Sequence, residues 1–141
     1  MKEKIIVSAC LLGDTCKYNG GHNFCEKVKT YIQDYEVIKI CPEVMGGLET
    51  PRIPCERVGN KVFNENKEDK TYEFYKGANI ALELAKEHNV RKAILKAKSP
   101  SCGKDYIYDG TFSKKIINGH GVCAQLFLEN GIQILREDEI L

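Results

Sequence analysis

The sequence contains no tryptophan, and although it has seven cysteines it contains no Cys-x-x-Cys pair. The missing spacing counts against zinc ribbons, thioredoxin-like redox sites and the usual ferredoxin motifs. Seven is an odd number, so the cysteines cannot all pair within the chain. No signal-peptide core follows Met1 to Lys4,. We therefore expect a cytoplasmic protein whose thiols stay reduced and serve a metal site or catalysis more readily than disulfides.

Long apolar runs and an excess of charge are also missing. No stretch approaches the ~18 apolar residues that a membrane span requires. The 21 basic residues nearly balance the 20 acidic ones, which gives a formal net charge of +1. A charge near zero lacks the electrostatic footprint of a nonspecific nucleic-acid-binding protein. We expect a small-molecule substrate, with no membrane partner and no strong nucleic-acid signature.

Strand and helix patterns alternate along the chain. Short runs rich in β-branched residues predict strands at 4–8, 35–40, 92–97 and 132–135,. Apolar residues at helical spacing predict helices over 23–33, 68–89 and 121–129,. The inward-facing positions of these helices are Phe24, Val28, Ile32, Phe74, Ala78, Ala81, Ala85, Val122, Leu126 and Phe127. The alternation predicts one α/β domain over residues 1–141, with a mostly parallel, Rossmann-like sheet flanked by helices.

Two segments break this alternation. Residues 41–56 contain three prolines and two adjacent glycines, which predict a long loop with neither helix nor strand,. The following residues, 57–63, predict a small hairpin insertion around Gly59-Asn60,. A second loop region, 98–118, has room for short extended pieces.

Three cysteines follow predicted strands. Cys10, Cys41 and Cys102 come shortly after the first, second and third strands. Because the carboxyl ends of parallel strands share one edge, where ligands bind, these thiols are expected to converge. The alternative is that they are unrelated loop thiols. Cys16 competes for the same site, and Cys55 is open to either role.

The remaining two cysteines, Cys25 and Cys123, lie in predicted helices and are expected to pack as small hydrophobic residues,.

Three convergent thiolates suit either a zinc ion or an iron–sulfur cluster, and three ligands leave one position open for catalysis. Glu43 lies two residues after Cys41, where it could act as a general base,. Ser101 directly precedes Cys102 and could supply a hydroxyl. The alternatives are a loop-capping carboxylate and a turn hydroxyl.

At these positions the sequence resembles the thiouracil desulfurase family, long known as a domain of unknown function. The matching stretches are Val7 to Gly13 with Tyr18 and Gly20, Cys41-Pro42-Glu43 through Gly46-Gly47-Leu48 to Thr50-Pro51-Arg52, Ala93 to Lys96 with Ser99 to Gly103, Ile107 to Phe112, and Gly119 to Val122. They run through nearly the whole chain. The sequence departs from the family pattern at Lys17-Tyr18-Asn19-Gly20, where Arg-Tyr-Asp-Gly is common, and at Cys55-Glu56, where an alanine often precedes the glutamate.

The resemblance implies a 4Fe–4S cluster held by Cys10, Cys41 and Cys102, with one iron not bound by protein. It implies removal of sulfur from a thiolated pyrimidine base or nucleotide, of the thiouracil or 4-thio-UMP type. The products would be the oxo form and hydrogen sulfide, with no net redox change. Two other functions stay open: sulfur transfer for nucleotide or tRNA thiolation, and a non-catalytic zinc- or cluster-binding module.

Within this reading, three residues take roles in the reaction. Glu43 would activate the attacking water, and Ser101 would relay a proton or hold the ring,. Arg52 would anchor a substrate phosphate, or else fix its loop,.

Overall fold

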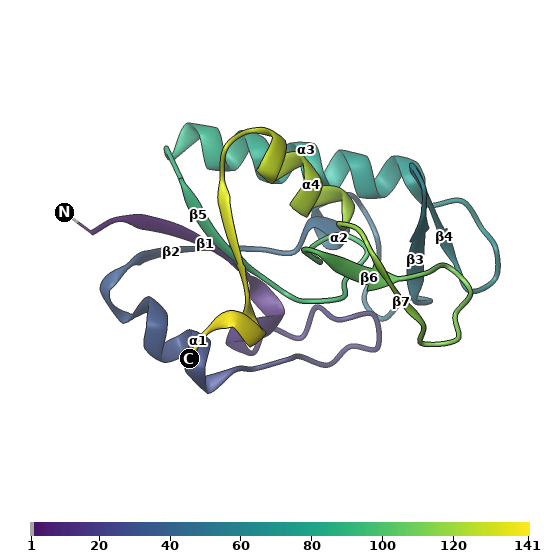
Figure 1. The fold of residues 1–141 in the computed structure, drawn as a ribbon, viewed down its shortest axis with the longest axis horizontal. Coiled ribbons are helices and arrows are strands. Elements are labelled where there is room, and N and C mark those ends of the chain that lie inside the picture. The colour runs from purple at the N-terminus through teal and green to yellow at the C-terminus, as the bar shows by residue number, and fades with distance from the viewer. Residues whose placement is uncertain (1) are drawn as a thin grey trace.

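A four-stranded sheet lies at the centre of the computed structural model, which describes residues 2–141 (Figure 1). All of its neighbouring strands are parallel, and their order is β2-β1-β5-β8. The strands are β1 (Lys4–Ser8), β2 (Glu36–Ile40), β5 (Lys92–Leu95) and β8 (Gln133–Arg136). The central strand β1 is buried on both faces, which explains its unbroken apolar run Ile5-Ile6-Val7,. The predicted α/β class with a parallel sheet is confirmed.

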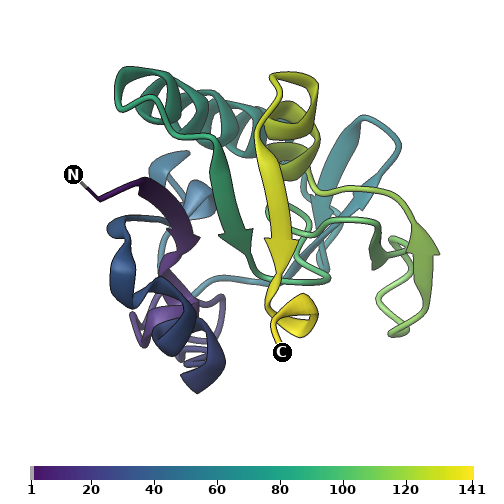
Figure 2. The same ribbon diagram turned by 60° about the vertical axis from the view of Figure 1, so that its left-hand side comes forward.

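Alternate side chains of the sheet enter two separate cores. Ile6, Ala93 and Leu95 pack with α3 (Thr71–Glu87) and α4 (Val122–Glu129). Ile5, Val7 and Ile94 pack on the opposite face, with α1 (Glu26–Tyr31) and the short 3-10 helix η1 (Ala9–Leu12). Figure 2 shows α3 and α4 together on one side of the sheet and α1 on the other. The sheet is therefore covered on both faces and leaves its strand ends free for a site.

Helix α3 matches its predicted periodicity, whereas α1 begins later than predicted, although Val28 and Ile32 are buried as expected. The predicted inward positions Phe74, Ala78, Ala81 and Ala85 of α3 are all buried. The prediction of a helix from residue 23 is wrong, because α1 begins only at Glu26.

The physical reason lies in the backbone hydrogen bonds of the preceding segment. The N–H groups of Asn23 and Cys25 donate to the carbonyls of Cys10 and Leu11, each at 2.9 Å. Residues 23–25 are therefore tied to η1 and not to a helical turn. Phe24 consequently stays 42% exposed.

Two small hairpins extend beyond the sheet. The first joins β3 (Cys55–Val58) to β4 (Lys61–Asn64) through Gly59-Asn60, as predicted, but it begins two residues earlier than expected. Gly59 has φ +60° at the first central position of the turn. Hairpin turns of two residues require a positive φ there, which glycine adopts easily. The second hairpin joins β6 (Tyr106–Tyr108) to β7 (Ile116–Asn118) within the predicted 98–118 loop region.

A single helical turn, α2 (Pro42–Met45), occupies the start of the segment predicted to have no helix or strand. That prediction is wrong because Pro42 sits in the first turn, where no intrahelical N–H is needed and proline is tolerated,. A glycine on each side lets α2 approach α3 closely. A Cβ on Gly77 would lie 1.8 Å from the carbonyl oxygen of Pro42, and one on Gly46 would lie 1.9 Å from that of Glu73. This contact fixes the position of α2.

Two further 3-10 turns complete the chain, η2 (Ile32–Asp34) and η3 (Glu137–Glu139). Within residues 2–141, no helix is both long enough and apolar enough to cross a membrane.

Candidate active site

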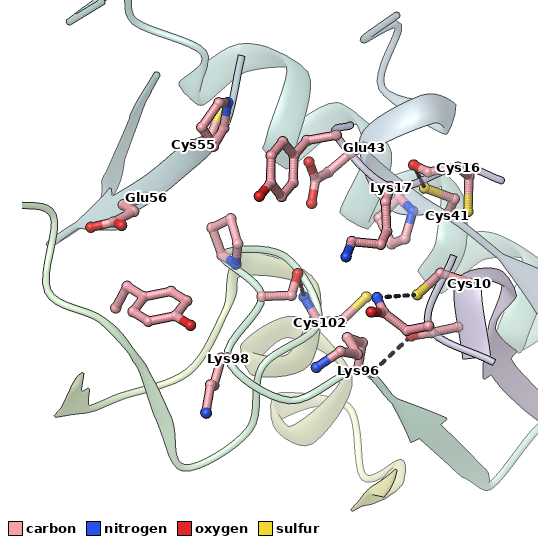
Figure 3. A pocket seen from close by; sticks show the side chains of 18 of the residues that line it. Cys10, Cys16, Lys17, Cys41, Glu43, Cys55, Glu56, Lys96, Lys98 and Cys102 are labelled. Carbon is pink, nitrogen blue, oxygen red and sulfur yellow. Dashed lines mark hydrogen bonds between the residues drawn. The ribbon is translucent and has the colours of Figure 1, made fainter. Parts of the chain in front are cut away.

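A pocket of about 480 Å³ opens at the carboxyl ends of the parallel strands (Figure 3). The chain runs from β1 to β2 on one side and continues to β5 on the other, so the strand order reverses between β1 and β5. Ligands of open α/β sheets bind at such switch points. Five of the seven cysteines line the pocket: Cys10, Cys16, Cys41, Cys55 and Cys102.

The three cysteines predicted to converge do share this pocket. Cys10 lies in η1, Cys41 is the N-cap of α2, and Cys102 follows β5 in the chain. Burial raises the pKa of the Cys102 thiol well above its usual value, and the nearby Cys10 and Cys41 thiols raise it further. The three thiols are therefore close enough to oppose one another's ionisation. A bound metal group would relieve the repulsion between their negative charges.

The chemistry of the three thiols suits an iron–sulfur cluster. Within the described residues 2–141, no three Cys, His, Asp or Glu side chains are close enough to hold one metal ion. The thiolates of an iron–sulfur cluster each bind a different iron, so they sit farther apart than the ligands of one ion. Soft thiolates are also the donors that such clusters take. The donor set Cys10, Cys41 and Cys102 thus fits the predicted 4Fe–4S group.

Polar neighbours orient two of these thiols. The Cys10 sulfur accepts a hydrogen bond from Asn23 Nδ2 at 3.6 Å; burial raises the pKa of Cys10, and this bond opposes the rise. The backbone N–H of Cys102 donates to Ser99 Oγ at 2.9 Å. The first bond positions the Cys10 sulfur, and the second positions the backbone of Cys102.

Cys16 is the closest neighbour of Cys41 among the other thiols. Cys41 Sγ lies 3.8 Å from the carbonyl oxygen of Cys16, and Figure 3 shows the two side chains adjacent. The Cys16 thiol, acting as a hydrogen-bond donor, lowers the pKa of Cys41 to about 7, with help from the backbone of Val44. The same contact raises the pKa of Cys16. Cys41 is therefore the more readily ionised thiol of the pair.

Cys55 lies apart from these four thiols. Figure 3 places it on the other side of the pocket from Cys10 and Cys41. Burial raises the pKa of Cys55 to about 12, and its thiol lies 3.7 Å from the carbonyl oxygen of Ile53.

The two cysteines outside the pocket pack against the hydrophobic cores. Cys123 is fully buried beside α3 and β8, and Cys25 packs in the core under α1.

Glu43 and Arg52 form a largely buried ion pair beside the thiols. Arg52 Nε donates to Glu43 Oε1 at 3.1 Å, and their side chains are only 9% and 15% exposed. Burial raises the pKa of Glu43, while the Arg52 charge opposes that rise. The pair uses only Oε1 of the carboxylate, which leaves Oε2 for a water molecule or substrate.

The other donors of Arg52 are committed to the protein. Nη1 donates to the carbonyl of Glu49 and to Thr50 Oγ1, at 3.2 and 3.1 Å. Nη2 donates to the carbonyl of Cys16 at 2.9 Å. Arg52 thus joins Glu43 of α2 to two loop segments, its own at 49–52 and the one that contains Cys16.

Ser101 lies outside the pocket lining, unlike the other predicted site residues. It is fully buried, and its Oγ has no hydrogen-bond partner within residues 2–141. Its carbonyl accepts hydrogen bonds from the first turn of α4, from Cys123 N at 2.8 Å and Ala124 N at 3.0 Å. Ser101 is therefore tied to the start of α4, beside Cys102 in the chain, and its hydroxyl does not line the pocket that Glu43 and Arg52 share.

Residues 5–139 match the sequence profile of the 2-thiouracil desulfurase family. The chain belongs to this family. The predicted family and the predicted desulfurase class are thereby confirmed.

Two similar proteins extend this result. The uncharacterized protein YbbK of Bacillus subtilis (strain 168) is 40% identical over 146 residues, covering 96% of this chain and 97% of YbbK. The solved structure of the [4Fe-4S]-dependent thiouracil desulfidase TudS is 42% identical, with a TM-score of 0.92 over 99% of this chain and 93% of that one. The match to TudS agrees with the predicted fold, and together with the family profile it supports the predicted iron–sulfur-dependent desulfuration.

The pocket of this 2-thiouracil desulfurase family member also contains lysines, which no sequence pattern had marked as site residues. Lys17, Lys96, Lys98 and Lys114 all line the pocket. Lys96 lies beside Cys102 in Figure 3, and its Nζ is 2.9 Å from Glu137 Oε2. The sequence offered one signal for Lys96, which directly follows strand β5 and therefore lies at the carboxyl end where ligands bind,.

Proposed function

We propose that Cys10, Cys41 and Cys102 hold a 4Fe–4S cluster with one iron free of protein ligands, and that this pocket desulfurates a thiolated pyrimidine base or nucleotide. In the reaction, water replaces the thiocarbonyl sulfur, giving the oxo pyrimidine and hydrogen sulfide, so the oxidation states do not change. The observation that carries this proposal is the convergence of three thiols on a pocket that also holds a buried carboxylate.

The cluster, when bound, supplies a thiophilic Lewis acid at the iron that lacks a protein ligand. The general base is assigned to Glu43, whose raised pKa makes it more basic than an exposed glutamate,. Its Oε2 accepts the proton of the attacking water while Oε1 stays paired with Arg52. Burial keeps bulk water away from this carboxylate, which strengthens its interactions with the substrate.

The role of Arg52 follows from its hydrogen bonds. Its donors already bind Glu43 and three loop acceptors, so it is better suited to positioning Glu43 than to anchoring a phosphate. Lys17, Lys98 and Lys114 form no ion pair within the described residues, and they line the same pocket. These three ammonium groups support a nucleotide phosphate as part of the substrate.

A proton-relay role for Ser101 stays a prediction. The burial of Ser101 outside the pocket lining does not favour this role. Its contacts with the first turn of α4 instead support a role in placing Cys102.

The proposal is tested by sulfide release from 2-thiouracil and 4-thio-UMP by anaerobically reconstituted protein. We expect one sulfide per substrate without an added electron donor or acceptor. No release from either compound by iron-loaded protein contradicts the proposed activity.

The ligand set is tested separately by iron content. We expect Cys41→Ala to lose the cluster, whereas Cys55→Ala and the packing variant Cys25→Ala keep it. Full iron content and an unchanged absorption spectrum in Cys41→Ala contradict the three-cysteine assignment, and bound zinc in place of iron favours a structural metal module. Cluster loss in Cys16→Ala would mean that Cys16 is a fourth ligand.

A further inference from the structure

The β6–β7 loop (residues 109–115) forms a wall of the pocket that supplies no cysteine. Phe112 and Lys114 of this loop line the pocket, together with Tyr108 at the end of β6. An aromatic ring and an ammonium group on one loop suit a flat heterocycle that carries an anionic group. This loop is therefore placed to bind the substrate away from the thiols.

One carboxylate fastens this loop to the rest of the pocket. Oε1 of Glu56, in β3, accepts hydrogen bonds from Gly110 N at 2.9 Å and Phe112 N at 3.1 Å. Glu56 is only 8% exposed and forms no ion pair within residues 2–141. Burying a carboxylate without a cation is costly, so these two charge-assisted bonds are its main compensation.

The loop adopts a conformation that it would not favour alone. Phe112 and Lys114 have φ values of +57° and +64°, in the left-handed region that non-glycine residues rarely adopt,. Gly110 has φ +94°, and a Cβ there would lie 2.4 Å from Val58 of β3. Such strained residues persist only where surrounding contacts determine them. The two hydrogen bonds that Glu56 accepts from Gly110 N and Phe112 N are such contacts, and they come from outside the loop.

We propose that Glu56 is a positioning residue that sets substrate affinity by holding the β6–β7 loop, and with it Phe112 and Lys114, against the pocket. This inference rests on the proposed function. Figure 3 places Glu56 on the opposite side of the pocket from Cys10 and Cys41. Glu56 therefore acts on binding of the substrate and not on cleavage of the carbon–sulfur bond.

The kinetic test compares Glu56→Leu and Glu56→Gln in the reconstituted holoprotein, with thiouracil and 4-thio-UMP as substrates. Leucine removes the acceptor, so we expect KM to rise about tenfold with kcat within about twofold of wild type. Glutamine keeps a carbonyl acceptor for both N–H groups, so its KM should stay near the wild-type value. Glu83→Leu, on the exposed face of α3, controls for the loss of a negative charge and should not change KM.

A loss of kcat at constant KM in Glu56→Leu would overturn the proposal, as would equal kinetic effects of leucine and glutamine. Loss of iron from Glu56→Leu would also overturn it, because the cysteines should not depend on this loop.

A second readout does not depend on activity. Trypsin can cut after the exposed Lys114 and Lys115 only where the loop opens. We expect faster cleavage there, and faster amide exchange at Gly110 and Phe112, in Glu56→Leu but not in Glu56→Gln. Unchanged cleavage and exchange in Glu56→Leu would contradict the holding role, even if wild-type protein desulfurates neither substrate. The proposed function and this inference can thus fail separately.

Phe112→Ala provides a variant that leaves the buried carboxylate in place. We expect it to raise KM with iron content unchanged, and we expect the double variant with Glu56→Leu to be no worse than the more damaging single change. Fully additive effects on KM would show that Glu56 does not act through the loop. If Glu56→Leu does not fold, an unchanged KM in Phe112→Ala would by itself overturn the proposal.

Discussion

Replacing Gly77 by alanine should damage the site from a distance, because Gly77 is where α3 touches α2. A Cβ at this position would lie 1.8 Å from the carbonyl oxygen of Pro42 and 2.7 Å from its carbon, whereas ordinary contacts begin near 3.4 Å. The helical turn α2 would have to move away by more than an ångström. This turn contains Glu43, and Cys41 is its N-cap. A shift of that size costs about 100-fold in rate where geometry governs catalysis.

The sign of the change in unfolding free energy gives a second test of Gly77→Ala. Helix propensity alone predicts a gain of about 1 kcal/mol for this change. The overlap with Pro42 predicts instead a net loss, since overpacking typically costs about 1–3 kcal/mol,. Urea denaturation measures this difference, and Asn79→Ala on the exposed face of α3 is the matched control, expected to be neutral or slightly stabilising. A more stable Gly77→Ala with wild-type activity would refute this account of the α2–α3 contact.

Three further changes test the electrostatics. Glu43→Gln should lower kcat by roughly 100- to 10,000-fold with iron content unchanged. The wild-type kcat should rise with pH through a pKa above the usual glutamate range, because the general base must lose its proton. A pH-independent kcat would contradict the role of Glu43 as the base. Lys96→Met removes a cation that is paired with Glu137 and lies beside Cys102. The reduction potential of the reconstituted cluster should therefore fall by tens of millivolts, the size that Coulomb's law gives at an effective dielectric constant of about 20. Voltammetry measures this potential, and a rise would contradict the prediction. Lys92→Met should raise the pKa of Tyr31, now lowered chiefly by the Lys92 Nζ at 3.0 Å, as followed by ultraviolet titration.

The sheet and the thiol site follow from local patterns in the sequence. Buried β-branched runs identified the four parallel strands, and the rule that their carboxyl ends share an edge brought Cys10, Cys41 and Cys102 together,. Local sequence patterns gave wrong helix boundaries where tertiary contacts determine the backbone conformation. The apolar spacing of Phe24, Val28 and Ile32 suggested a longer helix, but hydrogen bonds to η1 hold the first of these outside it.

The rest of the pocket depends on contacts between distant residues. No periodicity marks the β6–β7 loop as a pocket wall, because its place is set by Glu56, more than fifty residues earlier in the chain. The role of Ser101 stays a prediction. Its position beside Cys102 suggested a catalytic hydroxyl, and its side chain is fully buried, outside the pocket lining.

The central claim is that three cysteines hold a 4Fe–4S cluster whose remaining iron is open to the substrate. Mössbauer spectroscopy of anaerobically reconstituted, iron-57-labelled protein tests it most directly. We expect one iron site distinct from the other three, and we expect the signal of that site alone to change when 2-thiouracil is added. Four equivalent thiolate-bound sites that do not respond to 2-thiouracil would contradict it.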